Sequence, residues 1–206
     1  MRKLFLSSSF KDVANRFRDF AQEDVNGKTV TFIPTASIPE KIKFYVGSAR
    51  KAFQKIGIIV DDLDVSQSSS TEIAEKLEQN DYIYVSGGNT FFLLQELRKK
   101  GAEKMIIDQI ESGKLYIGES AGSMIVSPDI EYVKDMDDCK AATGLDTFSA
   151  LGVIDFYPLP HYQNFPFTKA IDKIISKYAS ELKLYPISNN QMIWVKGPDV
   201  KIETSS

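Results

Sequence analysis

The segment "YIGESAGSMI" (residues 116–125) decides how this chain is interpreted, because it carries an apolar run through glycine, serine and glycine into a candidate helix. Residues 118–122 have the G-x-S-x-G spacing of a nucleophile elbow, in which Ser120 would stand on a sharp strand-to-helix turn. The residues two before and two after such a serine must lack bulk, because backbones crowd together there. Glycines are common at strand–helix junctions, so a plain structural turn remains open as the alternative.

Strand-like and helix-like segments alternate on both sides of this motif. Short apolar runs rich in Val, Ile, Tyr and Phe predict strands at 3–8, 29–35, 56–62, 81–88 and 114–120. Amphipathic stretches between them predict helices at 10–23, 39–55, 70–79 and 90–112, the last split at Gly101. This alternation predicts an α/β fold: a doubly wound, mostly parallel sheet with helices on both faces. With 206 residues and 43% hydrophobic content, residues 1–206 are expected to form a single domain.

The pattern changes after residue 128. An acidic, irregular stretch is followed by an expected strand at 149–160 and an expected helix at 166–181. Residues 183–203 predict two or three short strands, with turns at Asn189-Asn190 and Gly197-Pro198. These strands would form a small antiparallel edge on the parallel sheet near the C-terminus.

Composition excludes several classes of function. The net charge is −3 and the basic residues are scattered, which argues against nucleic acid as a partner. No window approaches the roughly 18 apolar residues of a membrane span, and the run from Leu4 to Leu6 is too short for a secretory signal. The single cysteine, Cys139, excludes an intrachain disulfide and suits a reducing cytosol, so we expect a cytoplasmic protein. One histidine and one cysteine make a zinc site improbable, and no metal or cofactor is expected.

The polar and reactive residues follow the ends of the predicted strands. They lie at 7–9, 34–37, 86–90, 119–123 and, after the later strand, 159–164. Ligands bind beyond the carboxyl ends of the strands in parallel sheets of this type. The sequence therefore predicts a site at this edge of the sheet.

A nucleophilic serine needs a base, because its hydroxyl is inert at neutral pH. The chain has one histidine, His161, just after the late strand and at the same predicted edge as Ser120. A lone histidine is more often a surface or core residue than a catalyst, yet no other histidine could activate Ser120. The base in turn needs an acceptor to fix its tautomer. Composition alone does not choose among the acids between the two residues: Asp129, Glu131, Asp135, Asp137, Asp138 and Asp146.

The loop at "SGGNTFFLLQEL" (86–97) supplies a candidate oxyanion hole. Asn89 suits the N-cap of the following helix, and the glycines at 87 and 88 allow close backbone approach. The backbone N–H groups of Gly88 and Ala121 would bind the oxyanion. A nucleotide-binding glycine loop is less favoured, since neither G-x-G-x-x-G nor a P-loop lysine is present.

Four motifs together resemble the peptidase E (aspartyl dipeptidase) family, which also includes cyanophycinase. They are Gly-Gly-Asn-Thr-Phe at 87–91, the segment 118–123, "KDM" at 134–136 and "PH" at 160–161. The resemblance covers most of the chain and implies a serine peptidase on a fold similar to class I glutamine amidotransferases. It also implies Ser120 as nucleophile and His161 as base, and it favours Asp135 as the acid.

The expected activity is hydrolysis of a peptide bond in a small peptide, such as a dipeptide, through an acyl-enzyme on Ser120. We predict that Asn89, Thr90 and Glu119 bind substrate. Glu119 would hold the α-ammonium group of the substrate; the alternative is that Glu119 is a buried structural partner of the elbow. An acidic substrate side chain would need a cation, yet the last arginine is Arg98 and only lysines, beginning with Lys169, follow His161. A preference other than aspartate is therefore equally open.

Three alternatives remain at this stage. One is an esterase or amidase acting on a non-peptide substrate, and another is a catalytically silent binding or regulatory homologue that keeps the elbow as architecture. Amphipathic periodicity does not separate a dimer face from the core, so a homodimer also stays open.

Overall fold

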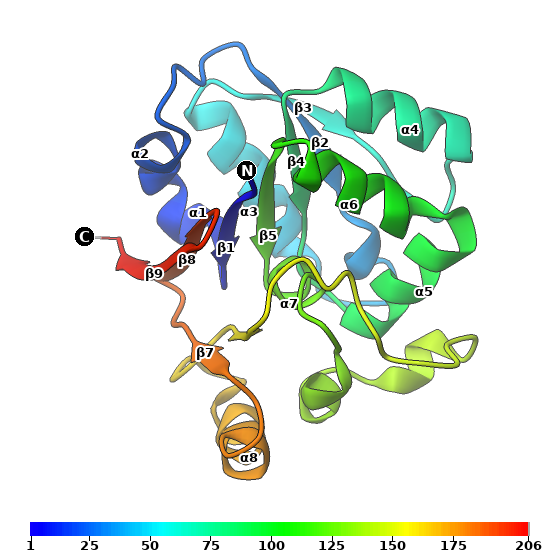
Figure 1. The fold of residues 1–206 in the computed structure, drawn as a ribbon, viewed down its shortest axis with the longest axis vertical. Coiled ribbons are helices and arrows are strands. Elements are labelled where there is room, and N and C mark those ends of the chain that lie inside the picture. The colour runs from blue at the N-terminus through cyan, green and yellow to red at the C-terminus, as the bar shows by residue number, and fades with distance from the viewer. Residues whose placement is uncertain (206) are drawn as a thin grey trace.

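A seven-stranded sheet forms the centre of the computed structural model, which describes residues 1–205 (Figure 1). The strand order is β3-β2-β4-β5-β1-β8-β9. The first five strands in this order run parallel, while β8 and β9 run antiparallel to their neighbours. The strands are β1 (Lys3–Ser7), β2 (Thr29–Ile33), β3 (Ile59–Asp62), β4 (Tyr82–Val85), β5 (Leu115–Glu119), β8 (Gln191–Lys196) and β9 (Asp199–Thr204).

Helices cover both faces of the sheet, and each face buries its own apolar cluster. One cluster joins α1, α2 and α3 to the sheet and is rich in phenylalanine, whereas the other joins α4, α5, α6, α7 and α8 to the opposite face. The α-helices are α1 (Phe10–Val13), α2 (Phe17–Ala21), α3 (Phe44–Lys55), α4 (Ser70–Gln79), α5 (Thr90–Lys100), α6 (Ala102–Glu111), α7 (Ala121–Met124) and α8 (Thr168–Tyr178). Short 3₁₀ helices are η1 (Ala14–Arg16), η2 (Thr35–Ser37), η3 (Glu131–Asp135) and η4 (Cys139–Ala142). The predicted doubly wound sheet with an antiparallel C-terminal edge is thus confirmed.

The expected break at Gly101 is confirmed, since Gly101 ends α5 in the left-handed conformation with φ +68° and α6 begins at the next residue. The helix expected over 10–23 is instead divided into α1, η1 and α2. Val13 and Asn15, which have modest helix propensity, stand at this division. Here tertiary packing decides the conformation: Phe10 and Phe17 both pack edge-on against Phe5 of β1.

The strand expected over 149–160 is mostly wrong. Within that range only β6 (Tyr157–Leu159) forms a strand, and it pairs with β7 (Leu184–Pro186) in a separate two-stranded sheet, while Ser149 forms an isolated bridge with Asp129. The backbone N–H groups of Ala150, Leu151 and Val153 bond instead to carbonyls of residues 125–128. Pro158 and Pro160 remove two of the donors that a ladder in the main sheet would need. In Figure 1, β7 and α8 lie beyond the carboxyl ends of the strands, so this segment covers the edge where the polar loops gather.

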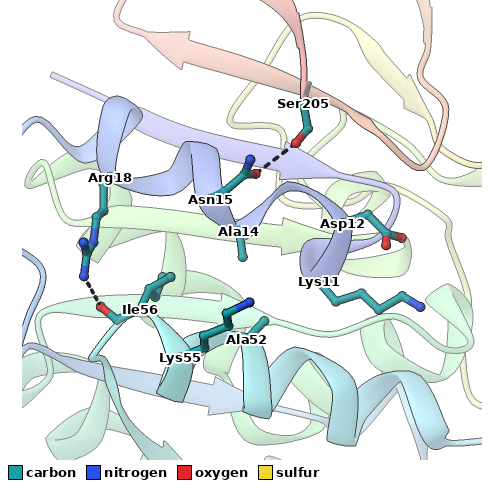
Figure 2. A pocket seen from close by; sticks show the side chains of 9 residues that line it. All are labelled: Lys11, Asp12, Ala14, Asn15, Arg18, Ala52, Lys55, Ile56 and Ser205. Atoms are coloured by element: carbon teal, nitrogen blue, oxygen red, sulfur yellow. Dashed lines mark hydrogen bonds between the residues drawn. The ribbon is translucent and has the colours of Figure 1, made fainter.

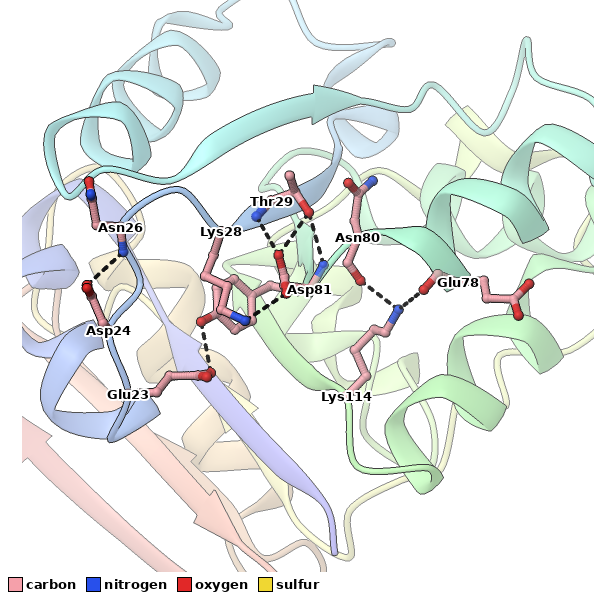
Figure 3. Close-up of polar contacts among 10 residues, drawn as sticks. Glu23, Asp24, Asn26, Lys28, Thr29, Glu78, Asn80, Asp81 and Lys114 are labelled. Carbon is pink, nitrogen blue, oxygen red and sulfur yellow. Dashed lines mark hydrogen bonds and ion pairs between the residues drawn. The ribbon is translucent and has the colours of Figure 1, made fainter.

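Polar contacts hold together the opposite end of the sheet, where the parallel strands β2, β4 and β5 begin (Figure 3). The Asp81 carboxylate accepts hydrogen bonds from the backbone N–H (2.8 Å) and hydroxyl (3.1 Å) of Thr29 and from the Lys28 ammonium (3.0 Å). The Lys114 ammonium donates to carbonyls at the end of α4, including those of Glu78 (2.8 Å) and Asn80 (2.7 Å). The polar side chains at this end of the sheet therefore stabilise the fold, whereas those at the carboxyl ends of the strands are available for a functional site.

No helix within residues 1–205 is both long and apolar enough to cross a lipid bilayer.

Replacing Asp81 with Asn should lower stability without changing the site at the far edge. Burial favours the neutral acid, but the bonds from Thr29 and Lys28 outweigh it and lower the pKa of Asp81 below its usual value. A carboxyl whose folded pKa is lowered stabilises the protein above its unfolded pKa, and this stability is lost as pH falls through the folded pKa. Thermal unfolding of Asp81→Asn near neutral pH should show a loss of about 1 kcal/mol, because partial exposure screens the pair.

The matched control is Asp108→Asn, which breaks the exposed Lys104–Asp108 pair on α6 and should leave the melting temperature almost unchanged. Equal melting temperatures for wild type and Asp81→Asn near neutral pH, or a difference that does not shrink as the pH falls into the acid range, would contradict this role of Asp81.

Candidate active site

Ser120 stands on a strained turn between β5 and α7. Its backbone has φ +50° and ψ −108°, a conformation that residues with a Cβ rarely adopt. The Ser120 N–H donates to the Ser7 carbonyl of β1 (2.9 Å), and the Ser120 carbonyl accepts from the N–H groups of Ser123 (2.8 Å) and Met124 (3.0 Å). The turn is therefore fixed on both sides by backbone hydrogen bonds.

The two glycines of the motif are required by close backbone contacts. A Cβ on Gly118 would lie 2.5 Å from the Gly122 carbonyl oxygen, and a Cβ on Gly122 would lie 2.0 Å from the Val85 carbonyl oxygen. The Tyr116 hydroxyl donates to the Gly122 carbonyl (2.7 Å), which holds the start of α7 against β5. The spacing G-x-S-x-G thus has a steric cause at both glycines.

The only histidine of the chain lies at hydrogen-bond distance from this serine. His161 Nε2 is 2.9 Å from Ser120 Oγ, and His161 Nδ1 is 2.9 Å from Asn189 Oδ1. The amide oxygen of Asn189 accepts from Nδ1–H, so the lone pair of the neutral ring lies on Nε2, facing the hydroxyl. The imidazole also stacks on Phe167 at a centroid distance of 4.6 Å, which fixes the plane of the ring.

The electrostatic setting keeps His161 neutral. Burial lowers the pKa of His161 below its ordinary value of 6.5, and the bond to Asn189 opposes this only in part. A neutral imidazole can accept a proton, so the group is in the form that a general base needs at neutral pH.

Two backbone N–H groups, one in the elbow and one in the loop after β4, have no acceptor within the described fold. A Cβ on Gly87 would lie 3.2 Å from the Ser120 Cβ, so the loop after β4 is in contact with the elbow. Gly88 has φ +134°, and a Cβ there would lie 2.1 Å from the Ala36 carbonyl oxygen, so only glycine fits. Among residues 1–205, the N–H groups of Gly88 and Ala121 have no hydrogen-bond acceptor.

The family model for peptidase family S51 matches residues 4–203. The chain belongs to peptidase family S51.

Several relatives support this membership. The chain is 51% identical over 200 residues to an uncharacterised peptidase of Listeria monocytogenes serovar 1/2a, covering 97% of each chain. It is 54% identical over 195 residues to an uncharacterised peptidase of Pasteurella multocida, covering 95% of this chain and 94% of the relative. It is also 28% identical over 169 residues to Peptidase E of a Nostoc strain, covering 79% of this chain and 66% of the relative.

Solved structures agree with the fold. A crystal structure of a candidate Peptidase E protein from Listeria monocytogenes EGD-e superimposes with a TM-score of 0.96 at 50% identity, covering 100% of both chains. A peptidase from an acI-B1 actinobacterium, 19% identical, superimposes with a TM-score of 0.76 over 100% of this chain and 88% of its own, which shows the shared fold. The chain is thus a member of a hydrolase family of peptidases.

The S51 resemblance favours Asp135 as the partner of His161, and the geometry corrects this. Asp135 ends η3, and its carboxylate pairs with the Lys173 ammonium of α8. The Nδ1 position of His161 is taken by Asn189 instead. Asp135 at the end of η3 thus lies next to α8, whereas Asn189, in the turn before β8, lies next to His161.

The three residues predicted to bind substrate all have internal partners. Asn89 Oδ1 accepts from Phe92 N–H (2.9 Å), which confirms the expected N-cap of α5, and Thr90 is bonded through its N–H (2.8 Å) and hydroxyl (2.6 Å) to Asp137. Glu119 is 3% exposed, and both its oxygens are hydrogen-bonded inside the protein. These buried side chains hold the loop after β4 and the elbow, and their placement does not support the prediction that they contact substrate.

One hollow in the described surface lies away from the serine (Figure 2). It measures about 530 Å³ and lies between α1, η1, α2 and α3; its lining includes Lys11, Asp12 and Arg18 but not Ser120 or His161. Within residues 1–205, no group of three or more His, Cys, Asp or Glu side chains is arranged to hold a metal ion.

Asn189 is a residue of this site that the sequence does not predict. The acids that the sequence offers as acceptors lie between Ser120 and His161, whereas Asn189 lies in the predicted Asn189-Asn190 turn. An amide oxygen accepts Nδ1–H as a carboxylate does, so polar residues in turns at the carboxyl ends of the strands are also candidate acceptors.

Gly122→Ala should destabilise the protein, because the new Cβ would enter the Val85 carbonyl at 2.0 Å and the elbow would have to move. We expect a loss of about 2–4 kcal/mol in urea-induced unfolding. Gly47→Ala on α3 is the matched control, since nothing lies within 4 Å of its Cβ, and it should be neutral or stabilising by up to about 1 kcal/mol. Equal midpoints for Gly122→Ala and wild type would refute the steric account.

Asn189→Asp should shift the pH dependence of peptide hydrolysis in a known direction. A carboxylate beside Nδ1 favours the imidazolium and raises the pKa of His161, so the acid limb of the kcat/KM profile should move up by about 1 pH unit. Asn189→Ala should lower kcat by about 10- to 100-fold, because the ring loses its orienting acceptor. An acid limb that stays in place in Asn189→Asp would contradict contact between these residues.

Proposed function

We propose that this S51 family member is a serine peptidase that cleaves a peptide bond in small peptides, including dipeptides, through an acyl-enzyme on Ser120. The observation that carries the proposal is the 2.9 Å contact between Ser120 Oγ and His161 Nε2 at a turn where Ser120 has φ +50°. A serine and a base within hydrogen-bond reach, with the base oriented by a third group, is the arrangement of an activated nucleophile.

The chemistry proceeds in two halves. In the first, Ser120 Oγ bonds to the substrate carbonyl carbon as His161 Nε2 accepts the hydroxyl proton. The carbonyl π electrons move to the oxygen, which the N–H groups of Gly88 and Ala121 stabilise. The tetrahedral intermediate collapses, the C–N bond breaks, and the His161 imidazolium donates its proton to the leaving amine. The acyl group remains on Ser120.

In the second half, water takes the place of the amine. His161 Nε2 accepts a proton from water as its oxygen attacks the acyl carbon, and the same N–H groups hold the oxyanion. Collapse breaks the bond to Ser120 Oγ, which recovers its proton from His161, and the peptide acid leaves. Asn189 keeps the ring in the tautomer needed in both halves but carries no charge to stabilise the imidazolium.

The substrate preference need not be aspartate. The Arg98 guanidinium is used inside the fold, where it donates to the carbonyls of Thr147 (2.8 Å) and Ser149 (2.6 Å) and pairs with Glu103. The first lysine after His161, Lys169, is exposed at the start of α8. Neither Arg98 nor Lys169 is held in a position to bind an acidic substrate side chain at Ser120. Substrates with neutral and basic first residues should therefore be tested beside acidic ones.

The test is hydrolysis of a dipeptide panel with acidic, neutral and basic first residues. Wild type should cleave part of the panel, whereas Ser120→Ala and His161→Ala should each lose at least about 1,000-fold in kcat, because either change removes the activated nucleophile. Circular dichroism should show both variants folded.

Substantial turnover in folded His161→Ala would sink the mechanism. Cleavage of esters or non-peptide amides, with no dipeptide cleaved, would assign the same machinery to a different substrate.

A further inference from the structure

We infer that Glu119 is a positioning residue of the elbow: its buried carboxyl group fixes the start of α1, and with it the loop that holds both Ser120 and His161. The inference rests on the role proposed above for Ser120. It concerns a group that does not touch the substrate and acts through the backbone of residues 7–10.

Glu119 connects β5 to two other elements. Its Oε1 accepts the backbone N–H of Phe10 at 2.9 Å, and its Oε2 accepts the hydroxyl of Tyr84 on β4. Phe10 is the first residue of α1, so its N–H has no acceptor within the helix. The carboxyl group supplies the acceptor that the helix start lacks.

The loop that precedes Phe10 contacts both reacting residues. The Ser7 carbonyl accepts the N–H of Ser120 at 2.9 Å. The Ser8 hydroxyl accepts the N–H of His161 at 3.0 Å and donates to the Ile187 carbonyl at 3.0 Å. Both Ser120 and His161 have positive φ, +50° and +65°, so each needs external contacts to keep its conformation.

A purely packing role does not require a carboxyl group at this position. The side chain of Glu119 contacts the Phe10 backbone and the Tyr84 hydroxyl, and the Phe10 ring in turn packs against Phe53 and Tyr84. An apolar residue would fill that space without the cost of burying a carboxylate. What an apolar residue lacks is the acceptor for Phe10 N–H. Contact with a substrate ammonium is excluded by the same geometry, since both oxygens are occupied and the residue is 3% exposed.

The charge of Glu119 should change how firmly the loop is held. Burial raises the pKa of Glu119 to about 7, and the titratable groups facing it are Tyr84 of β4, Tyr45 of α3, and Asp12 and Lys11 of α1. A carboxylate accepts both bonds as charge-assisted contacts, which are stronger than those of the neutral acid. The loop is therefore held most firmly when the pH is above the pKa of Glu119.

The test measures the rate at which a fluorophosphonate labels Ser120, since this reaction needs the nucleophile and the base but no identified substrate. At about pH 8, Glu119→Ala should lower the maximal inactivation rate constant by about 30- to 100-fold and change the half-saturating probe concentration by less than about 3-fold. Glu119→Gln keeps an acceptor for Phe10 N–H and should lose only about 3- to 10-fold. The matched control is Glu96→Ala on α5, another buried glutamate, which should stay within about 2-fold of wild type.

The loop route predicts a non-additive double variant. Ser8→Ala removes the contact to His161, and Glu119→Ala with Ser8→Ala should lose clearly less than the product of the two single losses. If the loss in labelling rate of the double variant equals the product of the two single losses, the route through the loop is wrong. If Glu119→Ala is labelled as fast as wild type, the inference itself is wrong. Folded wild type that does not label at all would instead remove the proposed function, and this inference with it.

A second measurement does not depend on Glu119→Ala folding. The backbone amide resonance of Phe10 should titrate in wild type with a midpoint near the Glu119 pKa of about 7 and lose that titration in Glu119→Gln. A Phe10 amide that does not respond to pH across this range in wild type would overturn the anchoring contact.

Discussion

The turn at Ser120 is the constraint on which the rest of the site depends. A serine with φ +50° costs of the order of 1–3 kcal/mol and persists only where its surroundings enforce it. Three enforcing contacts come from different parts of the chain: the Ser7 carbonyl of β1, the first turn of α7, and the Val85 carbonyl against Gly122. The turn can form because β1, β4 and β5 are neighbours in the parallel sheet.

His161 is brought to this turn by the C-terminal part of the chain. His161 follows β6, its ring stacks on Phe167 before α8, and its acceptor Asn189 lies in the turn between β7 and β8. Asn189 itself is held by its backbone N–H, which donates to Asn164 Oδ1 at 2.9 Å. The segment from β6 to β8 therefore holds the His161 imidazole beside the Ser120 hydroxyl. The Ser8 hydroxyl joins this segment to the sheet at the backbone of His161.

The sequence predicts the sheet and the elbow well for physical reasons. Strands of a parallel sheet are buried on both faces, so they read as continuous apolar runs, and the glycines at 118 and 122 are fixed by sterics within a few residues of Ser120. The expected strand over 149–160 fails because its N–H groups bond to residues 125–128, a contact that no local pattern encodes. Asn189 and Asp135 show the same limit at the site. Which polar side chain meets His161 depends on where separate segments pack, and the family resemblance favours Asp135, which pairs with Lys173 instead.

The central claim is that Ser120 is a nucleophile activated by His161, and covalent labelling located by mass spectrometry tests it most directly. After treatment with a fluorophosphonate, wild type should carry one adduct, and peptide mapping should place it on Ser120. His161→Ala should form that adduct at least about 100-fold more slowly, because its serine has no base. An adduct on a different serine, or equal labelling rates for folded wild type and His161→Ala, would contradict the account.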